Sequence, residues 1–264
     1  MQAYEAIAFE RLDGVARITM DRPDALNAWT PELGRELLDA LRTAAVDPGV
    51  RAVLVTGAGR AFSAGADVKV PREITADGEP DLSTRLREIY NPIMLEIRQA
   101  PKPVIAAVNG PAAGLGCSLA LACDLTLAAE SAYFLLAFAR LGVMPDGGAC
   151  LFLAERIGLA RTAELAICGE PLPATQALDW GLINAVHPDD QLGTAAHELA
   201  TRLATGPTLA YANIKRTLRA ASQTSLTEHL AFEATLQQEH ATSADYAEGV
   251  RAFVERRAPR FIGS

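Results

Sequence analysis

The segment VIAAVNGPAAGLGCS, residues 104–118, combines a buried strand, a glycine-rich turn and the beginning of a helix. The apolar run 104–108 predicts the strand, Asn109-Gly110 predicts the turn, and the small and apolar residues from about Leu115 to Cys123 predict the helix. A helix N-terminus has backbone N–H groups without intrahelical partners and a positive potential. The segment therefore suits a ligand oxygen that gains negative charge.

A second segment of the same type comes earlier in the chain. The buried strand predicted at residues 52–56 leads into AFSAGAD, residues 61–67, whose small side chains let the backbone approach a ligand closely. Two such loops at adjacent strand ends could supply the two N–H donors of an oxyanion hole. Ordinary tight turns have a similar composition, so both interpretations stay open at this point.

A third segment, LGVMPDGG at residues 141–148, places Asp146 just before a helix predicted at residues 149–157. The residues around it are apolar: Phe138, Leu141, Val143 and Met144. Such surroundings would desolvate the carboxylate and raise its pKa toward that of a useful general base or acid. Alternatively, Asp146 caps the helix that follows.

Strands alternate with helices through most of the chain, which predicts an α/β fold. From residue 193 onward only helices are expected: 193–204, 209–221, 225–242 and 243–257. We therefore expect a core with the active site, residues 1–192, and a helical region, residues 193–264, that packs against the core or another subunit. The polar segment 69–82 is predicted to be a mobile loop that shapes specificity.

The charge and composition favour a cytoplasmic protein. The chain has 24 Lys and Arg and 32 Asp and Glu, and its sequence contains no basic block. This composition argues against nucleic acid or an anionic membrane as a partner. The longest apolar run, residues 132–139, is too short to span a bilayer, and the N-terminus lacks a signal-peptide pattern. The four cysteines form no CxxC pair, so we expect buried thiols.

Together with DRPDALN at residues 21–27 and EGVRAF at 248–253, the three segments resemble the crotonase (enoyl-CoA hydratase/isomerase) superfamily over nearly the whole chain. The resemblance implies a spiral of ββα repeats and a C-terminal helical region that forms a homotrimer or a dimer of trimers. It also implies a coenzyme A thioester substrate, with no metal and no permanently bound cofactor. By the match, the backbone N–H groups of Ala64 and Leu115 form the oxyanion hole that holds the thioester carbonyl.

The resemblance departs from the family's hydratases at two positions. Those enzymes use two glutamates to activate water, and Ser118 and Phe138 stand in their places here. Asp146 instead matches the single catalytic acid of family isomerases, including the Δ3,Δ2-enoyl-CoA and ring-epoxyphenylacetyl-CoA isomerases. We therefore expect an isomerase that shifts a double bond from C3=C4 to C2=C3 or acts on a ring-type acyl-CoA. A hydratase with atypical water activation and a non-catalytic acyl-CoA-binding protein remain alternatives.

Further residues are candidates for binding the substrate. The resemblance places the CoA tail along residues 26–28 and 64–67, with contacts expected at Leu26, Ala28, Ala66 and Asp67. The acyl pocket is expected to include Phe138, with Phe134 and Leu141. Arg22 could bind a phosphate bidentately, or it could be a surface arginine paired with neighbouring acids. Phe253 matches a segment that can approach the adenine, sometimes from a neighbouring subunit; a Phe that only packs its helix would look the same.

Overall fold

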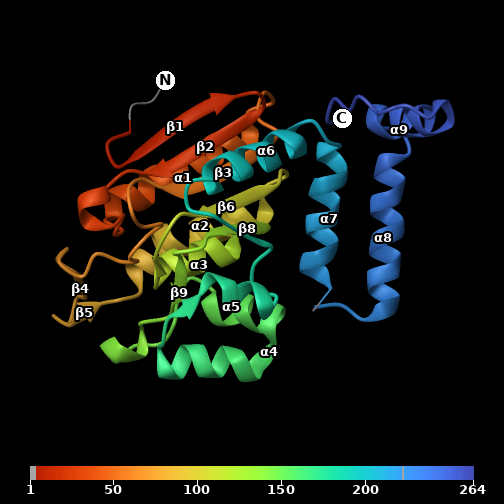
Figure 1. The fold of residues 1–264 in the computed structure, drawn as a ribbon. Helices are drawn as coiled ribbons and strands as arrows, with labels where there is room; N and C mark the ends of the chain where they lie inside the picture. The colour runs from red at the N-terminus through yellow and green to blue at the C-terminus, as the bar shows by residue number, and fades with distance from the viewer. Residues whose placement is uncertain (1–3, 222) are drawn as a thin grey trace.

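A six-stranded sheet forms the centre of the protein in the computed structural model, which describes residues 4–221 and 223–264 (Figure 1). The strand order is β1-β2-β3-β6-β8-β11, in which β1 and β2 form an antiparallel hairpin and the other neighbours are parallel. The strands are β1 (Ile7–Leu12), β2 (Val15–Met20), β3 (Ala52–Gly57), β6 (Val104–Val108), β8 (Leu125–Ala129) and β11 (Ala185–His187). The predicted α/β class is confirmed. The prediction that no signal peptide is present draws partly on residues 1–3, which lie outside the described residues.

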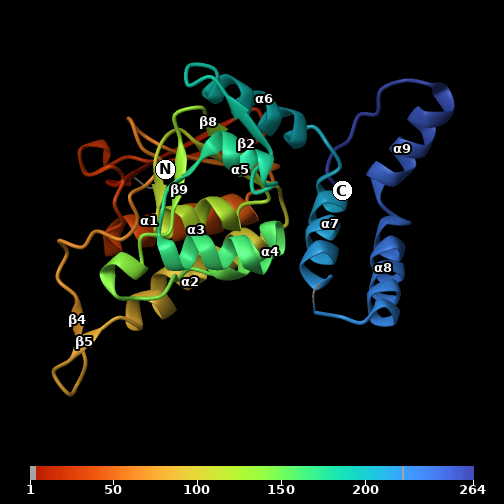
Figure 2. The same ribbon diagram turned by 60° about the horizontal axis from the view of Figure 1, so that its bottom comes forward.

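Helices cover both faces of this sheet (Figure 2). On one face lie α1 (Pro31–Val46), α2 (Asn91–Gln99) and α3 (Leu115–Ala122), and on the other lies α6 (Leu192–Ala204). The start of α1 follows from its sequence, because the Thr30 side chain accepts a hydrogen bond from the Leu33 N–H and Pro31 occupies the first helical position. Burial on both faces explains why β3 and β6 consist almost entirely of apolar residues.

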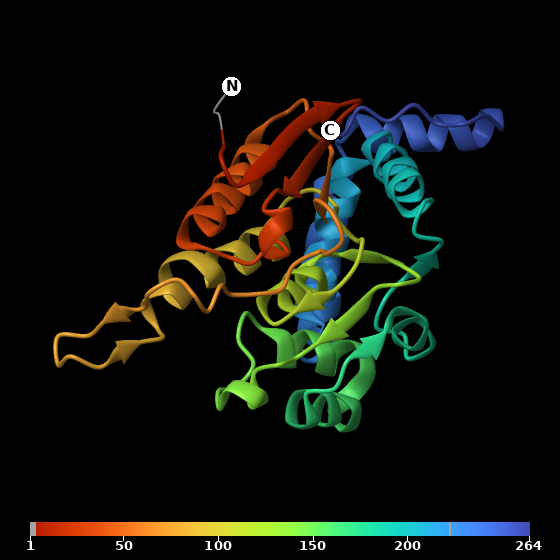
Figure 3. The same ribbon diagram turned by 60° about the vertical axis from the view of Figure 1, so that its left-hand side comes forward.

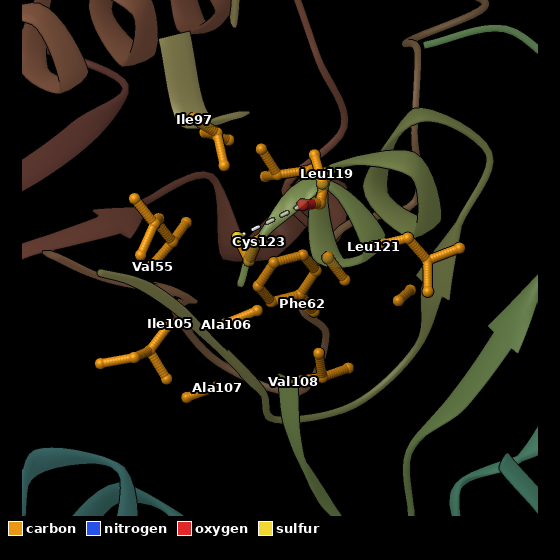
Figure 4. Close-up of a cluster of buried hydrophobic side chains, with 14 of the residues drawn as sticks. Val55, Phe62, Ile97, Ile105, Ala106, Ala107, Val108, Leu119, Leu121 and Cys123 are labelled. Carbon is orange, nitrogen blue, oxygen red and sulfur yellow. Dashed lines mark hydrogen bonds between the residues drawn. The ribbon is translucent and has the colours of Figure 1, made fainter. Parts of the chain in front are cut away.

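The core between sheet and helices is densely apolar (Figure 4). Phe62 is fully buried among side chains from β3, β6 and α3. Cys123 contributes to this cluster, with its Sγ 3.4 Å from the Leu119 carbonyl oxygen. Of the four free cysteines, Cys117 and Cys123 are buried as expected, whereas Cys150 and Cys168 are exposed in the single chain, so the prediction of buried thiols is wrong for these two.

A second, smaller sheet and its neighbouring helices are formed by other parts of the chain. This three-stranded sheet has the order β10-β9-β7, formed by β10 (Leu172–Pro173), β9 (Tyr133–Leu135) and β7 (Ala112–Ala113). The helices here are η3 (Ala139–Leu141), α4 (Ala149–Cys168) and α5 (Ala174–Asp179). Gly158 interrupts α4 with a non-helical conformation, so the helix predicted for residues 149–157 ends where the sequence indicated.

The parallel strands end at one edge of the sheet, and their following loops gather there. The loop after β2 contains η1 (Pro23–Ala25), the loop after β3 covers residues 58–67, and the loop after β6 leads to α3. Ligands of open α/β sheets bind at this type of edge. Segment 69–82, expected to be a loop, includes the short hairpin of β4 (Glu73–Ile74) and β5 (Pro80–Asp81), which projects from the body in Figure 3. It leads through a π-helical turn, η2 (Leu86–Tyr90), into α2.

Three helices extend away from the core at the C-terminus: α7 (Thr208–Ala220), α8 (Leu226–His240) and α9 (Ala244–Glu255) (Figures 1 and 2). The first is anchored by Lys215, whose Nζ lies 2.7 Å from Asp124 Oδ2 and donates to the Ile97 and Lys102 carbonyls. None of the helices in residues 4–221 and 223–264 is long and apolar enough to cross a membrane.

Candidate active site

Asn27 joins the loops that follow β2 and β3. It is fully buried in a left-handed conformation with φ of 54°. Its side-chain amide donates to the carbonyl oxygens of Ala58 and Ala61, at 2.9 and 2.8 Å. Its Oδ1 accepts from the Arg22 N–H at 2.9 Å. Asparagine is among the few residues that tolerate this backbone region, so it can both form the turn and fix the neighbouring loop.

Ser63 joins the loops that follow β3 and β6. Its hydroxyl donates to the Asn27 carbonyl at 2.9 Å and accepts from the Gly65 N–H at 3.1 Å. Its backbone N–H donates to the Pro111 oxygen, and its carbonyl accepts from Ala113. Sequence reasoning missed the positioning roles of Asn27 and Ser63, because both depend on contacts far apart in the chain.

Gly65 brings the two glycine-rich loops into contact. A Cβ at this position would lie 2.7 Å from the Ala113 oxygen and 3.1 Å from the Leu115 backbone nitrogen. Its φ of 84° also disfavours any residue with a side chain. The backbone of residues 65–66 therefore lies directly against the N-terminus of α3, as an oxyanion hole made by both loops requires.

The predicted donor Ala64 is corrected by the structure. Its N–H donates to the Leu26 carbonyl at 2.9 Å, so it is occupied within the protein. The next residues pair with Trp29: the Gly65 oxygen accepts from Trp29, and the Asp67 N–H donates to Trp29. Successive N–H groups of an extended segment point to opposite sides, so the Ala66 N–H points away from Trp29. Within the described residues it has no acceptor, which makes Ala66 the donor candidate in this loop.

Leu115, the other predicted donor, is the first residue of α3. Among the hydrogen bonds of residues 4–221 and 223–264, none is donated by its backbone N–H to a loop or side chain. The first N–H groups of a helix have no intrahelical acceptor, so this donor is available to a ligand.

Asp146 lies on the loop that covers Leu115. A Cβ on the next residue, Gly147, would lie 3.1 Å from Leu115 Cδ2 and 2.9 Å from Ser118 Cβ. Burial raises the pKa of the Asp146 carboxyl from 3.8 to about 6. Its Oδ1 is buried and, among the described residues, has no hydrogen-bond partner. The following helix is capped at Gly148 without any side-chain bond, so the structure contradicts the alternative of Asp146 as a helix cap.

The two positions occupied by glutamates in the family's hydratases hold residues with other tasks. The Ser118 hydroxyl donates to the Asp146 backbone carbonyl at 2.9 Å and so ties the Asp146 loop to α3. Phe138 is 8% exposed, and its Cζ approaches within 3.8 Å of a Cβ placed on Gly114. Neither side chain can exchange a proton with a substrate as a glutamate would.

One cavity of about 730 Å³ brings most of these groups together. Asp146, Leu115 and Ala66 line it, with Phe138 and the apolar residues Leu141, Val143 and Met144. Of the predicted CoA contacts, Ala28 and Asp67 also line it, whereas Leu26 does not. Phe134 is buried beneath this layer and does not reach the cavity.

Arg22 and Phe253 occupy other surroundings. The Arg22 guanidinium donates to the Ala28 carbonyl and lies 3.4 Å from Asp67, so it links the two segments predicted to bind CoA and does not pair with its acidic neighbours in sequence. Phe253 is 85% exposed on α9 and lines a separate cavity between α7, α8 and α9. Within one chain it does not meet Asp146.

Two polar residues of the cavity, Tyr90 and Arg85, escaped the sequence analysis, whereas Glu73 belongs to segment 69–82, which was expected to shape specificity. No motif or local pattern around Tyr90 gives a reason to expect its hydroxyl in a cavity. In the described part of the chain, no group of three or more His, Cys, Asp or Glu side chains is placed to hold a metal ion.

The enoyl-CoA hydratase/isomerase family model matches residues 10–264. The chain belongs to this family. It is 41% identical to the 1,2-epoxyphenylacetyl-CoA isomerase of Escherichia coli K12 over 95% of both chains. It is 35% identical to the 2,3-dehydroadipyl-CoA hydratase of the same organism, over 96% of this chain and 97% of the relative.

The fold agrees with this membership. The crystal structure of an enoyl-CoA hydratase from Bacillus anthracis superposes with a TM-score of 0.90 at 32% identity, covering 98% of this chain and all of the other. The predicted crotonase fold and the assignment to an enzyme family that acts on acyl-CoA thioesters are therefore confirmed. Because the relatives include both an isomerase and a hydratase, the reaction has to be argued from the site.

Proposed function

We propose that this enzyme is an acyl-CoA isomerase that moves a double bond from C3=C4 to C2=C3 of a thioester, with Asp146 as its only proton-transferring side chain. The observation that carries the proposal is the unpaired, desolvated Asp146 carboxylate in one cavity with the N–H groups of Ala66 and Leu115. Its pKa of about 6 lets the same group act as a base and then as an acid near neutral pH.

The reaction follows from these three groups. The Ala66 and Leu115 N–H groups donate to the thioester oxygen, and the Asp146 carboxylate removes a proton from C2. The C–H electron pair then forms a dienolate whose negative charge rests on the thioester oxygen, where the two donors stabilise it. Asp146 returns the same proton to C4, which leaves the double bond at C2=C3 and restores the carboxylate.

Hydration is less well supported by this site. Addition of water needs a group that positions and activates the water molecule, in addition to the oxyanion hole. Ser118, at one hydratase position, is bound to the Asp146 carbonyl, and Phe138 fills the other. The single carboxylate therefore favours proton transfer within the substrate. A purely binding function would give no reason to keep an unpaired buried carboxylate.

Substrate binding and assembly complete the proposal. The CoA tail would follow Leu26, Ala28, Ala66 and Asp67, with Arg22 holding these segments together and close to the phosphates. No permanently bound cofactor takes part. The core, which includes helix α6 on the sheet, would carry the catalytic groups, and the helices α7, α8 and α9 that follow would form the trimer. Phe253 would then reach the adenine end of a neighbouring subunit's site.

The test compares 3-hexenoyl-CoA and 2-hexenoyl-CoA as substrates, with products separated by chromatography and weighed by mass spectrometry. The wild-type enzyme should interconvert the two without change in mass. Asp146→Asn should lower kcat by about 10²- to 10⁴-fold, since it removes the acid–base group. The exposed-carboxylate variant Asp190→Asn serves as the matched control and should behave as wild type.

Two outcomes would refute the assignment. One is isomerisation by Asp146→Asn at the wild-type rate. The other is conversion of 2-hexenoyl-CoA to a product heavier by one water at a rate exceeding isomerisation, which would make the enzyme a hydratase.

A further inference from the structure

Tyr90 presents a phenol to the cavity that holds Asp146. It ends the π-helical turn η2, and such turns occur frequently at functional sites. The residue is only 5% exposed, and its ring packs edge-on against Trp29 with centroids 5.5 Å apart. Gly34 of α1 leaves room on another side, since a Cβ there would lie 3.4 Å from Tyr90 Cε1. The ring is therefore fixed, and its hydroxyl is a preorganised group.

Within the described residues, the hydroxyl proton of Tyr90 is not used in a hydrogen bond. The Arg85 guanidinium lies close enough to lower the pKa of the phenol, but a guanidinium can only donate hydrogen bonds. The hydrogen bonds of residues 4–221 and 223–264 include none that the Tyr90 hydroxyl donates; its one side-chain partner is Arg85. Asp146 Oδ1 has no partner among these residues, so the two groups do not bond to each other. Burial outweighs Arg85 and raises the pKa of Tyr90, which keeps it a neutral donor.

The charges around Tyr90 restrict what it can bind. The Arg85 Nε lies 2.6 Å from Glu73 Oε2, so its positive charge is already compensated. The other charged residues lining the cavity are two cations, Lys69 and Arg72, and three anions, Asp67, Asp81 and Asp146. Asp67 lies 3.4 Å from Arg22, so its charge is compensated as well, and the remaining cations Lys69 and Arg72 balance Asp81 and Asp146. The lining therefore has no surplus positive charge that would hold a second carboxylate on the acyl group. A neutral oxygen with lone pairs fits the unused donor without needing such a charge.

We propose that Tyr90, positioned by Arg85, is a subsite for a neutral oxygen acceptor carried by the acyl group of the substrate. The substrate class is then an acyl-CoA whose ring or chain contains an ether, epoxide or carbonyl oxygen, with the apolar residues Phe138, Leu141 and Met144 contacting its carbon atoms. The inference rests on the proposed function to the extent that the acyl group occupies this cavity. It assigns Tyr90 to substrate selection and gives it no part in proton transfer.

The experiment uses thioesters that differ only by a ring CH₂ or an oxygen. Cyclohexylacetyl-CoA is the reference, and the three tetrahydropyranylacetyl-CoA isomers carry the oxygen at ring position 2, 3 or 4. Calorimetric titration of the whole enzyme should show that at least one isomer binds about 10-fold more tightly than the reference, as expected for one satisfied hydrogen bond. In Tyr90→Phe the same isomer should lose this advantage and bind no better than the reference.

The reference ligand and a second variant exclude trivial explanations. Cyclohexylacetyl-CoA should bind Tyr90→Phe as it binds wild type, because the ring and its contact with Trp29 remain. Tyr133→Phe, which removes a hydroxyl from a residue outside the cavity, should keep the preference. The proposal is overturned if wild type prefers none of the three isomers, if none of the four thioesters binds, or if Tyr90→Phe retains the preference.

Failure of this subsite and failure of the proposed isomerase function are distinguishable, because the titrations involve no turnover. If the enzyme isomerises 3-hexenoyl-CoA but binds the oxygen-containing thioesters no better than the reference, only the subsite proposal is refuted. If the enzyme prefers an oxygen-containing thioester but does not isomerise 3-hexenoyl-CoA, the subsite proposal is supported and the proposed double-bond isomerase function is refuted.

Discussion

The Asp146 carboxylate is held in an unfavourable environment by the residues around it. A carboxylate that accepts a backbone N–H or pairs with arginine has a pKa below its ordinary value: the Gly49 N–H and Arg11 lower the pKa of Asp47, and Arg85 lowers that of Glu73. Burial raises the pKa of Asp146, and its Oδ1 lacks a partner within the described residues. Groups of this kind concentrate at catalytic sites, where the protonation equilibrium itself is used.

This environment predicts that Asp146→Asn stabilises the protein near about pH 8 and has little effect near about pH 4. The folded protein holds the proton with a pKa of about 6, above the ordinary value of 3.8, so wild-type stability falls as the pH rises between these values. Asparagine does not ionise and avoids this loss, which is at most about 3 kcal/mol. Thermal unfolding of the wild type and of Asp146→Asn at both pH values measures the change in stability. An equal change in Tm at both pH values would contradict the prediction.

Single residues differ in how far the sequence could predict their roles. The role of Asp146 as a candidate acid or base could be predicted from the sequence, because its apolar neighbours and its Gly-Gly turn are close to it in the chain. The choice between Ala64 and Ala66 was not, because the direction of each N–H depends on pairing with Leu26 and Trp29, more than thirty residues away. Tyr90 was hidden because a π-helical turn shifts the side-chain directions that a regular helical pattern implies.

At the scale of the elements, the site depends on two loops that touch at one glycine. The loop after β3 and the start of α3 are correctly spaced only if Gly65 can lie against the Ala113 carbonyl and the Leu115 nitrogen. Ser63 fixes both loops through its backbone and its hydroxyl. The proposed oxyanion hole therefore depends on the contact between the loops.

Gly65→Ala should consequently lower kcat by about 10²-fold or more, since the new Cβ would push one N–H donor out of place. Gly181→Ala is the matched control: Gly181 has a similar φ of 76°, but nothing lies within 4 Å of its added Cβ. Both variants bear the same backbone strain, so comparing their kcat values and their Tm isolates the effect of the contact. Equal kcat for the two would show that the loop contact does not set the oxyanion hole.

The predictions of helices and strands were correct where the elements are long and have a strong apolar pattern. The strands β3 and β6 lie where the apolar runs at residues 52–56 and 104–108 predicted them. Strand β1 was not predicted, although it pairs with β2 along its whole length, because its exposed position leaves a weak apolar pattern. The two-residue strands β7 and β10 owe their existence to long-range pairing and have no local signal.

In the whole molecule, the helices that leave the core begin later than residue 193. Helix α6 packs on the sheet, so the separate region consists of α7, α8 and α9. Besides Lys215, the Arg219 guanidinium holds α7 to the core by donating to the Arg98 carbonyl at 2.7 Å. The region exposes large apolar side chains, including Leu226 at 73% and Phe253 at 85%. Such a patch is typical of a surface that another protein covers.

If copies of this chain cover that surface, the enzyme should have three times the 28.0 kDa mass of one chain, or six times if two trimers associate. Leu230 is the sharpest test, because it is 53% exposed on α8 and lines the apolar cavity of about 940 Å³ between α7, α8 and α9. A charge buried at every copy of an interface is strongly unfavourable, so Leu230→Asp should lower the mass toward that of one chain. Light scattering after gel filtration measures this.

Leu12→Asp is the matched control for the assembly, because Leu12 is similarly exposed, at 61%, but belongs to β1 and not to the three helices. It should leave the mass unchanged. If Phe253 reaches a neighbouring site, the dissociated Leu230→Asp protein should also bind hexanoyl-CoA more weakly, while Phe253→Ala should weaken that binding without lowering the mass. A monomeric wild type, or a Leu230→Asp protein that stays assembled, would show that these helices do not form the interface.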